Sequence, residues 1–260
     1  MNRQLLTSVP DCIPGQFRSL LEGAAVYDSS CSRTAQVFFI DKGPGFYLKT
    51  AAKGTLQKES LLTGFFHRLG LSAEVLAYES LAQDWLLTTR VPGEDCIHPQ
   101  YLDDPVRLCD TTAELLRRLH DIKAADCPMD HTANYMATAQ KNYAEHSYDT
   151  ASFPDNWGYA TVEEAWKVVE ENGKYLQTDT LLHGDYCLPN ILLDNWRFSG
   201  FIDLGNGGMG DRHVDLFWGI WSLHFNLKTD QYRDRFLDAY GRELVNEDVF
   251  RIIRAFEVFG

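Results

Sequence analysis

Leu182-His183-Gly184-Asp185-Tyr186-Cys187-Leu188-Pro189-Asn190-Ile191-Leu192-Leu193-Asp194, followed by Gly200-Phe201-Ile202-Asp203-Leu204-Gly205, is the most informative part of this sequence. It contains two carboxylates and one carboxamide, those of Asp185, Asp203 and Asn190. Asp185 and Asn190 lie five residues apart with a proline between them, which predicts one compact loop. These three polar side chains are therefore the first candidates for a functional site.

The residues after this loop have the pattern of a β-hairpin. Two short apolar segments flank the turn Asn195-Trp196-Arg197. Such a hairpin would return Asp203 close to Asn190. An amide oxygen beside a carboxylate suits Mg²⁺, which prefers oxygen ligands and binds phosphates as further ligands. Asp185, upstream on the loop, would then accept a proton from an attacking hydroxyl, so the pattern predicts phosphoryl transfer.

The motif His-Gly-Asp-x-x-x-x-Asn, followed by Ile-Asp, resembles that of the aminoglycoside phosphotransferases and related small-molecule kinases. Protein kinases carry a similar loop, with Arg in place of Gly184 and Asp-Phe-Gly in place of Asp203-Leu204-Gly205. The run from Leu182 to Gly205 is most similar to the 3′-phosphotransferases that inactivate kanamycin and neomycin. The resemblance implies phosphorylation of an aminoglycoside hydroxyl, the 3′-OH, by ATP (or GTP) with Mg²⁺, conferring antibiotic resistance.

Composition sets the class of protein and of partner. The chain has 260 residues, 45% of them apolar, enough for one large domain or two lobes. Its net charge of −13 argues against a nucleic-acid partner and suits a polycationic small molecule, although solubility alone would also explain it. The six cysteines form no Cys-x-x-Cys pair, and we see neither a secretory signal nor a membrane-spanning run. We expect a cytoplasmic protein with no membrane partner, as a monomer or weak dimer.

Hydrophobic patterning predicts two kinds of structure along the chain. Five strands of an antiparallel sheet are expected at 24–28, 35–40, 46–49, 74–79 and 85–89, with a helix at 55–69. Further helices are expected at 104–122, 161–172, 215–225, 230–240 and 247–259. With the resemblance, this predicts an α+β, bilobal protein-kinase-like fold with a mainly helical C-terminal lobe. Residues 1–90 would be the nucleotide-binding lobe, and residues 91–260 the catalytic and substrate-binding lobe.

The nucleotide-binding residues are predicted largely from the kinase plan. The connection 29–34, rich in small hydroxyl residues, would offer backbone N–H groups to phosphates, or be a plain surface turn. Lys49 ends the third strand, and Glu59 in the next helix matches its partner glutamate, the pair that holds the nucleotide phosphates in kinases. By similarity, backbone groups near Thr89 and Val91 would bind adenine. The predicted set is Ser29, Ser30, Ser32, Lys49, Glu59, Thr89 and Val91.

The substrate-binding residues follow from the resemblance. Asp155, in the segment that forms part of the antibiotic pocket of the family, is the preferred ammonium ligand, with a solvated loop charge as the alternative. Glu257 and Phe259 match an acidic and aromatic C-terminal tail that closes the aminoglycoside site, although Gly260 extends this tail. Asp215 is expected to tether the backbone of the catalytic loop, to cap its own helix, or both.

Three rival functions use the same residues. A kinase acting on choline, homoserine, a sugar or a macrolide would carry the same catalytic loop. A non-catalytic nucleotide-binding module would normally lack one of the four residues Lys49, Asp185, Asn190 and Asp203, and all four are present. A protein kinase would carry an activation loop ending in Ala-Pro-Glu, which no segment resembles.

Overall fold

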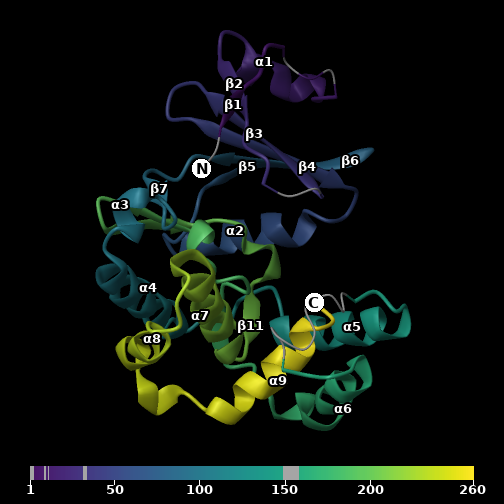
Figure 1. Cartoon of the computed structure of the whole chain (residues 1–260). Coiled ribbons are helices and arrows are strands. Elements are labelled where there is room, and N and C mark those ends of the chain that lie inside the picture. Colours follow the sequence, from purple (N-terminus) through teal and green to yellow (C-terminus); the bar gives the residue numbers. More distant parts are fainter. Residues whose placement is uncertain (1–2, 9, 11, 32–33, 149–157) are drawn as a thin grey trace. The chain divides into compact units, whose positions relative to one another are not determined.

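The computed structural model describes residues 3–8, 10, 12–31, 34–148 and 158–260, and Figure 1 traces them along the chain. Contacts divide the chain into two compact units. The first contains Met1–His98 and Pro189–Gly205, and the second contains Pro99–Leu188 and Asn206–Gly260. The assignment of nucleotide binding to residues 1–90 and of catalysis to residues 91–260 stays a prediction.

An antiparallel sheet dominates the first unit. In the described residues its six strands are, in spatial order, β1 (Gln4–Leu5), β2 (Ala25–Asp28), β3 (Ala35–Asp41), β4 (Phe46–Ala52), β6 (Gln83–Thr89) and β5 (Val75–Ser80). Two helices accompany the sheet, α1 (Arg18–Leu21) and α2 (Gln57–Arg68). All five predicted strands are present. The sequence prediction missed β1, because two residues are too few for an alternating pattern to be recognised.

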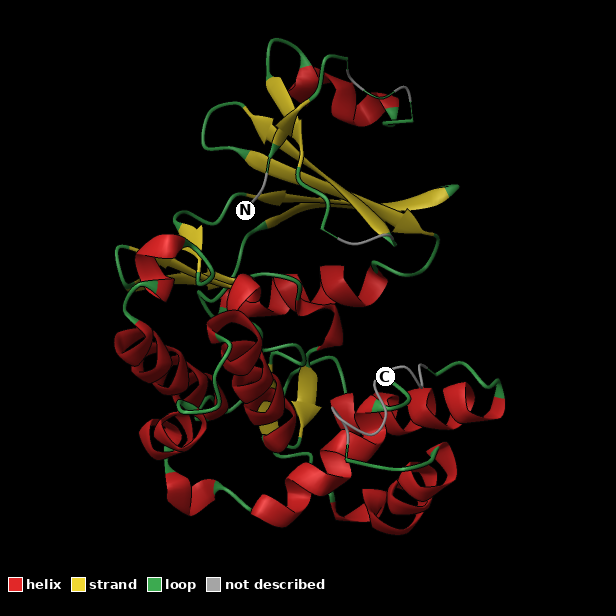
Figure 2. Cartoon of the chain, viewed as in Figure 1, coloured by secondary structure: helices red, strands yellow, loops and turns green. Residues whose placement is uncertain are grey.

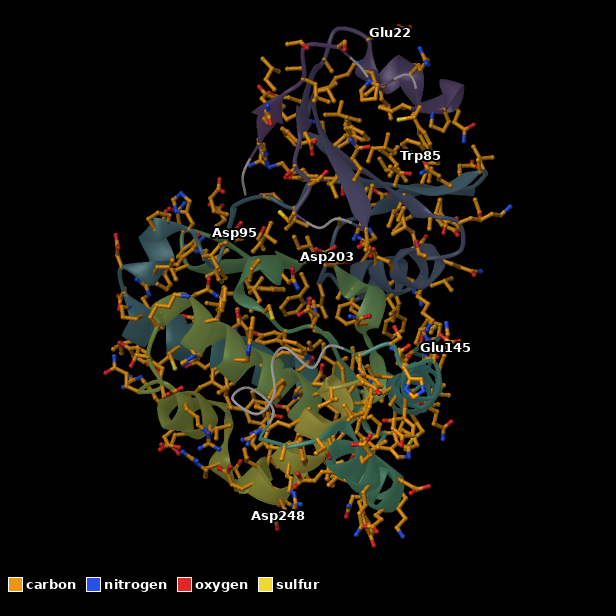
Figure 3. The ribbon with its side chains drawn as sticks, turned by 45° about the vertical axis from the view of Figure 1, so that its right-hand side comes forward. Glu22, Trp85, Asp95, Glu145, Asp203 and Asp248 are labelled. Carbon is orange, nitrogen blue, oxygen red and sulfur yellow. The ribbon has the colours of Figure 1, made fainter. Side chains whose placement is uncertain are left out.

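Alternation along β4 gives the two faces of the sheet different roles. On one face, Phe17 just before α1 packs on Trp85, which Figure 3 labels, with ring centroids 6.3 Å apart. Leu48 belongs to this buried cluster. Because neighbouring side chains of a strand point to opposite faces, Lys49 lies on the other face. Helix α2 packs against β5 of the same sheet, so its residues can reach this second face.

The predicted hairpin is confirmed. Strands β9 (Ile191–Asp194) and β10 (Arg197–Phe201) pair antiparallel, and β7 (Glu94–Asp95) extends them to a three-stranded sheet. Phe201 lies opposite Ile191, and the Ile202 N–H donates to the Asn190 carbonyl at 3.1 Å. This last hydrogen bond brings Asp203, the next residue, beside Asn190.

The second unit is mainly helical, as Figure 2 shows in red. Its helices are α3 (Pro99–Leu102), α4 (Pro105–His120), α5 (His131–Ala144), α6 (Val162–Asn172), α7 (His213–Leu227), α8 (Arg233–Tyr240) and α9 (Glu247–Glu257). Two strands, β8 (Thr180–Leu182) and β11 (Gly208–Gly210), pair antiparallel among them. Helix α5 was not predicted; its first turn is capped by Asp130, which accepts the Ala133 N–H. Within the described residues, no helix has both the length and the apolar character needed to cross a membrane.

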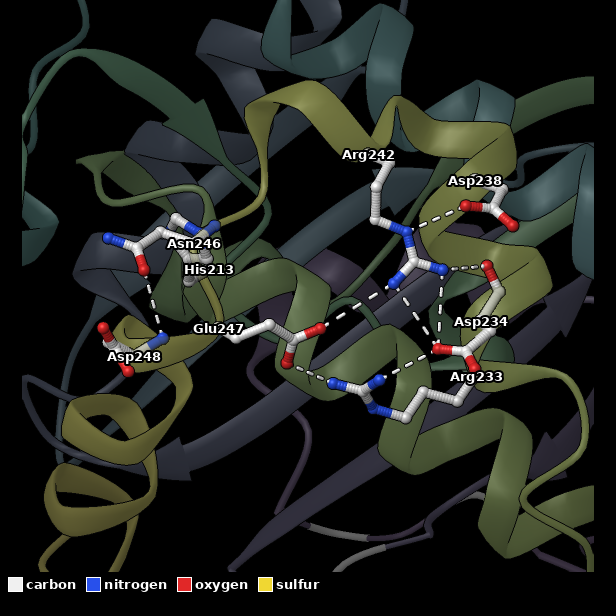
Figure 4. Close-up of polar contacts among 8 residues, drawn as sticks. All are labelled: His213, Arg233, Asp234, Asp238, Arg242, Asn246, Glu247 and Asp248. Carbon is white, nitrogen blue, oxygen red and sulfur yellow. Dashed lines mark hydrogen bonds and ion pairs between the residues drawn. The ribbon is translucent and has the colours of Figure 1, made fainter.

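An ionic network fixes the turn from α8 into α9, as Figure 4 shows. Arg242 donates to the Asp238 carboxylate at 2.8 Å and to the Asp234 carbonyl at 2.9 Å. Arg233 pairs with Asp234 and with Glu247, the first residue of α9. Because Glu247 is the first residue of α9, this network links the end of α8 to the start of α9.

Arg242→Ala should lower the free energy of unfolding by about 1 kcal/mol, because it removes several partly exposed ionic contacts and one bond to a carbonyl. Chemical denaturation measures this change. Arg118→Ala is the matched control, since Arg118 makes an exposed pair with Glu114 at 3.6 Å and should change stability by only a few tenths of a kcal/mol. Equal effects of the two variants would contradict the role given to the network.

Candidate active site

A lysine held by two carboxylates lies on the second face of the N-terminal sheet. Lys49 Nζ donates to both carboxylate oxygens of Glu59, at 2.9 and 2.8 Å, and to Asp203 Oδ1 at 2.7 Å. Burial alone would lower the pKa of Lys49, but the charges of Asp203 and Glu59 prevail and raise it. Lys49 therefore keeps its positive charge. The structure brings these three predicted residues together, and their roles stay predictions.

A residue that sequence reasoning missed positions the glutamate of this cluster. Asp84, on β6, is fully buried and accepts the Leu56 N–H at the start of α2 at 3.0 Å. The hydroxyls of Tyr78 and Ser80 also donate to it, at 3.0 and 2.7 Å. Burial would raise the pKa of Asp84, but these hydrogen bonds outweigh it and lower the pKa. The ionised carboxylate thereby anchors the helix turn from which Glu59 projects.

The two predicted metal ligands are adjacent in the structure. The Asn190 carbonyl accepts a hydrogen bond from the Ile202 N–H, and Asp203 is the next residue in the chain. Asn190 is buried, whereas half of the Asp203 side chain is exposed. Asp203 has a φ of 56°, a left-handed conformation that is uncommon outside glycine and recurs at functional sites. A carboxamide and a carboxylate are hard oxygen donors, so this pair fits Mg²⁺.

The loop that carries Asp185 is held by a buried carboxylate on α7. Asp215 accepts the N–H groups of His183 at 2.7 Å and Gly184 at 2.8 Å, which confirms the expected tether. It also contacts His120 Nε2 at 3.1 Å. Burial would raise the pKa of Asp215, but its hydrogen bonds, including that from His120, lower it, so the carboxylate stays ionised.

His120 supports this carboxylate as a neutral ring. Its Nδ1 lies 2.8 Å from the Tyr240 hydroxyl, and burial lowers its pKa. Because an ionised Asp215 can only accept, Nε2 must carry the ring proton and Nδ1 must accept from Tyr240. His120 is thus a structural residue, which supports the carboxylate that holds the two residues before Asp185.

Two further contacts fix the loop on either side of Asp185. The Tyr186 hydroxyl donates to the Thr112 carbonyl of α4 at 2.8 Å, and the Leu188 N–H donates to Ser222 Oγ of α7 at 2.9 Å. Gly184 has a φ of 83°, and a Cβ there would lie 2.0 Å from the Asn206 carbonyl oxygen. Any side chain here would meet the backbone of Asn206, so only glycine suits this position.

The predicted C-terminal residues lie in an aromatic environment. Glu257 accepts hydrogen bonds from the Tyr135 hydroxyl and from Trp218 Nε1, the latter at 3.2 Å. Burial raises the pKa of Glu257 to about 7, with a smaller contribution from the charge of Asp185. Phe259 is fully buried, with its ring centroid 5.7 Å from that of Trp166. Glu257 is therefore protonated more readily than an exposed glutamate.

The remaining predicted residues that the structure describes make local contacts through backbone and side chain alike: Ser30 Oγ accepts the Val37 N–H at 2.9 Å, and Thr89 Oγ1 accepts the Glu74 N–H at 3.0 Å. The Ser29 N–H donates to the Val37 carbonyl, and the Ser30 N–H donates to the Asp28 carboxylate. The Thr89 N–H donates to the Glu74 carbonyl, and the buried Val91 packs on Ala73 and Leu192. Ser32 and Asp155 lie outside the described residues. Substrate binding by Asp155 stays a prediction. The same holds for nucleotide binding near Ser29, Ser30, Ser32, Thr89 and Val91.

Comparisons with known proteins also identify phosphotransferases. Residues 32–253 match the model of the phosphotransferase enzyme family. A Lactococcus lactis subsp. lactis protein named "Probable aminoglycoside 3'-phosphotransferase" is 48% identical over 95% of each chain. An "Aminoglycoside 3'-phosphotransferase" of Niallia circulans is 32% identical over 68% of each chain. A crystal structure of aminoglycoside-3'-phosphotransferase of type VIII superposes with a TM-score of 0.76 at 25% identity, covering 94% of this chain and 97% of that one.

The fold and the comparisons together define a phosphotransferase of protein-kinase-like fold, with an alcohol group as the acceptor. The chain belongs to the phosphotransferase enzyme family. The predicted fold class and the resemblance to the aminoglycoside 3′-phosphotransferases are thus confirmed.

Asp215→Ala should lower both stability and catalysis, because two buried N–H groups of the loop lose their acceptor. We expect a loss of about 3 kcal/mol in the free energy of unfolding and a fall in kcat among the molecules that stay folded. Asp211→Ala is the matched control, since Asp211 is equally buried and accepts from Gln177 and His213 but makes no contact with the loop in the described bonds. It should lower stability while sparing kcat; an equal loss of kcat would contradict the tether.

Glu257 should make stability fall as the pH rises. Its folded-state pKa is about 7, above its ordinary value, so its protonated form stabilises the fold at low pH and that contribution is lost as the pH rises through 7. Between pH 6 and pH 8 the loss should amount to about 1 kcal/mol relative to Glu257→Gln. If the free energies of unfolding of the wild type and of Glu257→Gln change equally between pH 6 and pH 8, Glu257 does not titrate in this range.

Proposed function

We propose that this protein phosphorylates the 3′-hydroxyl of an aminoglycoside with ATP, with GTP as the other nucleotide to be tested, and so confers antibiotic resistance. The ion cluster of Lys49, Glu59 and Asp203 supports nucleotide use, because it reproduces the arrangement that holds phosphates in kinases. The observation that carries the choice of substrate is the 48% identity, over 95% of both chains, to a relative named as an aminoglycoside 3′-phosphotransferase.

In this proposal the main task of the protein's side chains is to hold the nucleotide and the substrate in position. Lys49, oriented by Glu59, would bind nucleotide phosphates and exchange part of its contact with Asp203 for them. Asn190 and Asp203 would hold Mg²⁺, whose charge neutralises phosphate oxygens when it is bound. Asp185 would orient the substrate hydroxyl and accept its proton, with its loop fixed in advance by the buried Asp215.

The substrate would be recognised through its ammonium groups. The net charge of −13 favours the approach of a polycation. Glu257 would bind an ammonium group near Asp185, and the buried Phe259 would fix the chain that carries it. Asp155 would supply a further carboxylate.

Replacing the proposed base or metal ligand should remove turnover while leaving the fold intact. Asp185→Asn should lower kcat about 10²- to 10⁴-fold, the usual contribution of a general base, and Asp203→Ala should abolish turnover. Asp194→Asn, at the exposed hairpin turn, is the matched control and should leave ADP release unchanged. Substantial activity of well-folded Asp203→Ala protein would exclude its assignment.

Lys49→Ala should mainly weaken nucleotide binding. Its KM for ATP should rise by tenfold or more, because a charge-assisted contact to phosphate is worth about 1.5–3 kcal/mol. Lys53→Ala, an exposed lysine just beyond the same strand, should leave this KM unchanged. An unaltered KM for ATP in Lys49→Ala would contradict the nucleotide site.

ADP release with kanamycin B and with its 3′-deoxy analogue tests the substrate and the position. Turnover of kanamycin B alone supports transfer to the 3′-hydroxyl. Turnover of both keeps the kinase reaction but moves the acceptor to another hydroxyl. ADP release with neither compound, in protein that binds ATP, would reject the aminoglycoside and favour another small hydroxyl compound.

A further inference from the structure

A buried chain of hydrogen bonds joins the end of helix α8 to the loop before Asp185. The Tyr240 hydroxyl lies 2.8 Å from His120 Nδ1, and His120 Nε2 lies 3.1 Å from Asp215 Oδ2. The Asp215 carboxylate also accepts the N–H groups of the two residues before Asp185. All three side chains of this chain of bonds are buried. The loop is therefore connected to a side chain of α8 through protein groups alone.

Every bond in this chain has a defined direction. The ionised Asp215 can only accept, so the proton of the neutral His120 ring lies on Nε2, and Nδ1 must accept from Tyr240. Burial raises the pKa of Tyr240 to about 12, so its hydroxyl keeps the proton that this bond requires. The Arg212 guanidinium, which can only donate, bonds the phenol oxygen as well. The hydroxyl proton of Tyr240 is therefore directed at His120.

Tyr240 is itself held in place, and it in turn fixes the plane of the His120 ring. Arg117 Nη1 on α4 donates to the Tyr240 carbonyl at 3.1 Å. The rings of Tyr240 and His120 meet edge to face, with centroids 5.6 Å apart. A ring that is hydrogen-bonded at one nitrogen can still turn about that bond, whereas bonds at both nitrogens define its plane. A donor at Nδ1 also polarises the ring, so Nε2 becomes a stronger donor to Asp215.

We infer that Tyr240 is a positioning residue for the proposed base Asp185, and that it acts through His120 and Asp215 on the loop. Its hydroxyl orients the His120 ring and strengthens the bond from that ring to Asp215, which keeps the two loop N–H groups in place. Phosphoryl transfer depends on the position of the base relative to the reacting hydroxyl, so a small displacement of the loop lowers kcat. This inference rests on the proposed function, and it assigns a role to a helix that carries none of the predicted site residues.

Tyr240→Phe removes a single oxygen atom and leaves the packing of the ring in place. We expect kcat with kanamycin B to fall about tenfold, less than the ~100-fold that a displacement of about 1 Å can cost. The KM for ATP and the KM for kanamycin B should not change, because Tyr240 contacts neither substrate in this proposal. Tyr159→Phe is the matched control: Tyr159 is also buried in this unit, and its hydroxyl donates to the Arg251 carbonyl at 2.6 Å, outside the chain of bonds. This variant should keep the wild-type kcat.

Amide hydrogen exchange, measured without any substrate, gives an independent readout of the loop. In Tyr240→Phe the N–H groups of His183 and Gly184 should exchange about tenfold faster than in the wild type, the factor for the loss of one buried hydrogen bond. The amides of helix α6 should exchange at the wild-type rate. In Tyr159→Phe the amides of His183 and Gly184 should also keep their wild-type rates.

The outcomes separate this inference from the proposed function. Turnover of kanamycin B by the wild type, with an unchanged kcat or unchanged exchange at the two loop amides in Tyr240→Phe, would overturn the inference and leave the proposed function intact. Equal losses of kcat in Tyr240→Phe and Tyr159→Phe would overturn it in favour of a general loss of stability. A wild type that turns over no aminoglycoside would reject the proposed function, whereas faster exchange at the two loop amides in Tyr240→Phe would still support the connection from Tyr240 to the loop.

Discussion

The buried carboxylate of Asp215 is the constraint on which the helical unit of this protein depends. It is ionised, accepts two N–H groups of the loop before Asp185, and accepts a further hydrogen bond from the neutral ring of His120. A buried charge is costly unless each of its lone pairs is used, and here the loop backbone itself supplies the donors. The same bonds that stabilise the charge therefore fix the position of the loop. Gly184 completes the arrangement, because its left-handed backbone leaves no space for a side chain.

The N-terminal unit also contains a largely buried charge, here a positive one. Lys49 is largely buried, and two carboxylates on different elements keep it ionised. One of them, Glu59, stands on a helix whose first turn is anchored by the buried Asp84. In both units, a buried Asp accepts backbone N–H groups beside a residue of the proposed site, Glu59 in one unit and Asp185 in the other, that it does not contact directly. The buried carboxylates thus fix the positions of backbone segments. A phosphoryl-transfer reaction depends chiefly on such fixed positions.

Sequence reasoning recovered the elements whose signal is local. The hairpin that brings Asp203 to Asn190 was predicted because its turn and two apolar segments adjoin in the chain. The positions of Lys49 and Glu59 followed from the kinase plan and are confirmed as neighbours. The supports of Glu257 could not be predicted, because Tyr135 lies 122 residues away from it on a helix with a weak apolar pattern. Helix α5 and strand β1 were missed for similar reasons, since one lacks a clear apolar face and the other has two residues.

Identification of the phosphorylated atom tests the central claim most directly. Wild-type protein would be incubated with Mg-ATP and kanamycin B, and the product examined by correlation of phosphorus with proton signals in NMR. The account predicts a single phosphomonoester whose phosphorus couples to the proton at C3′. Coupling to a proton at any other carbon, or an aminoglycoside recovered without phosphate while the protein consumes ATP on another acceptor, would contradict it.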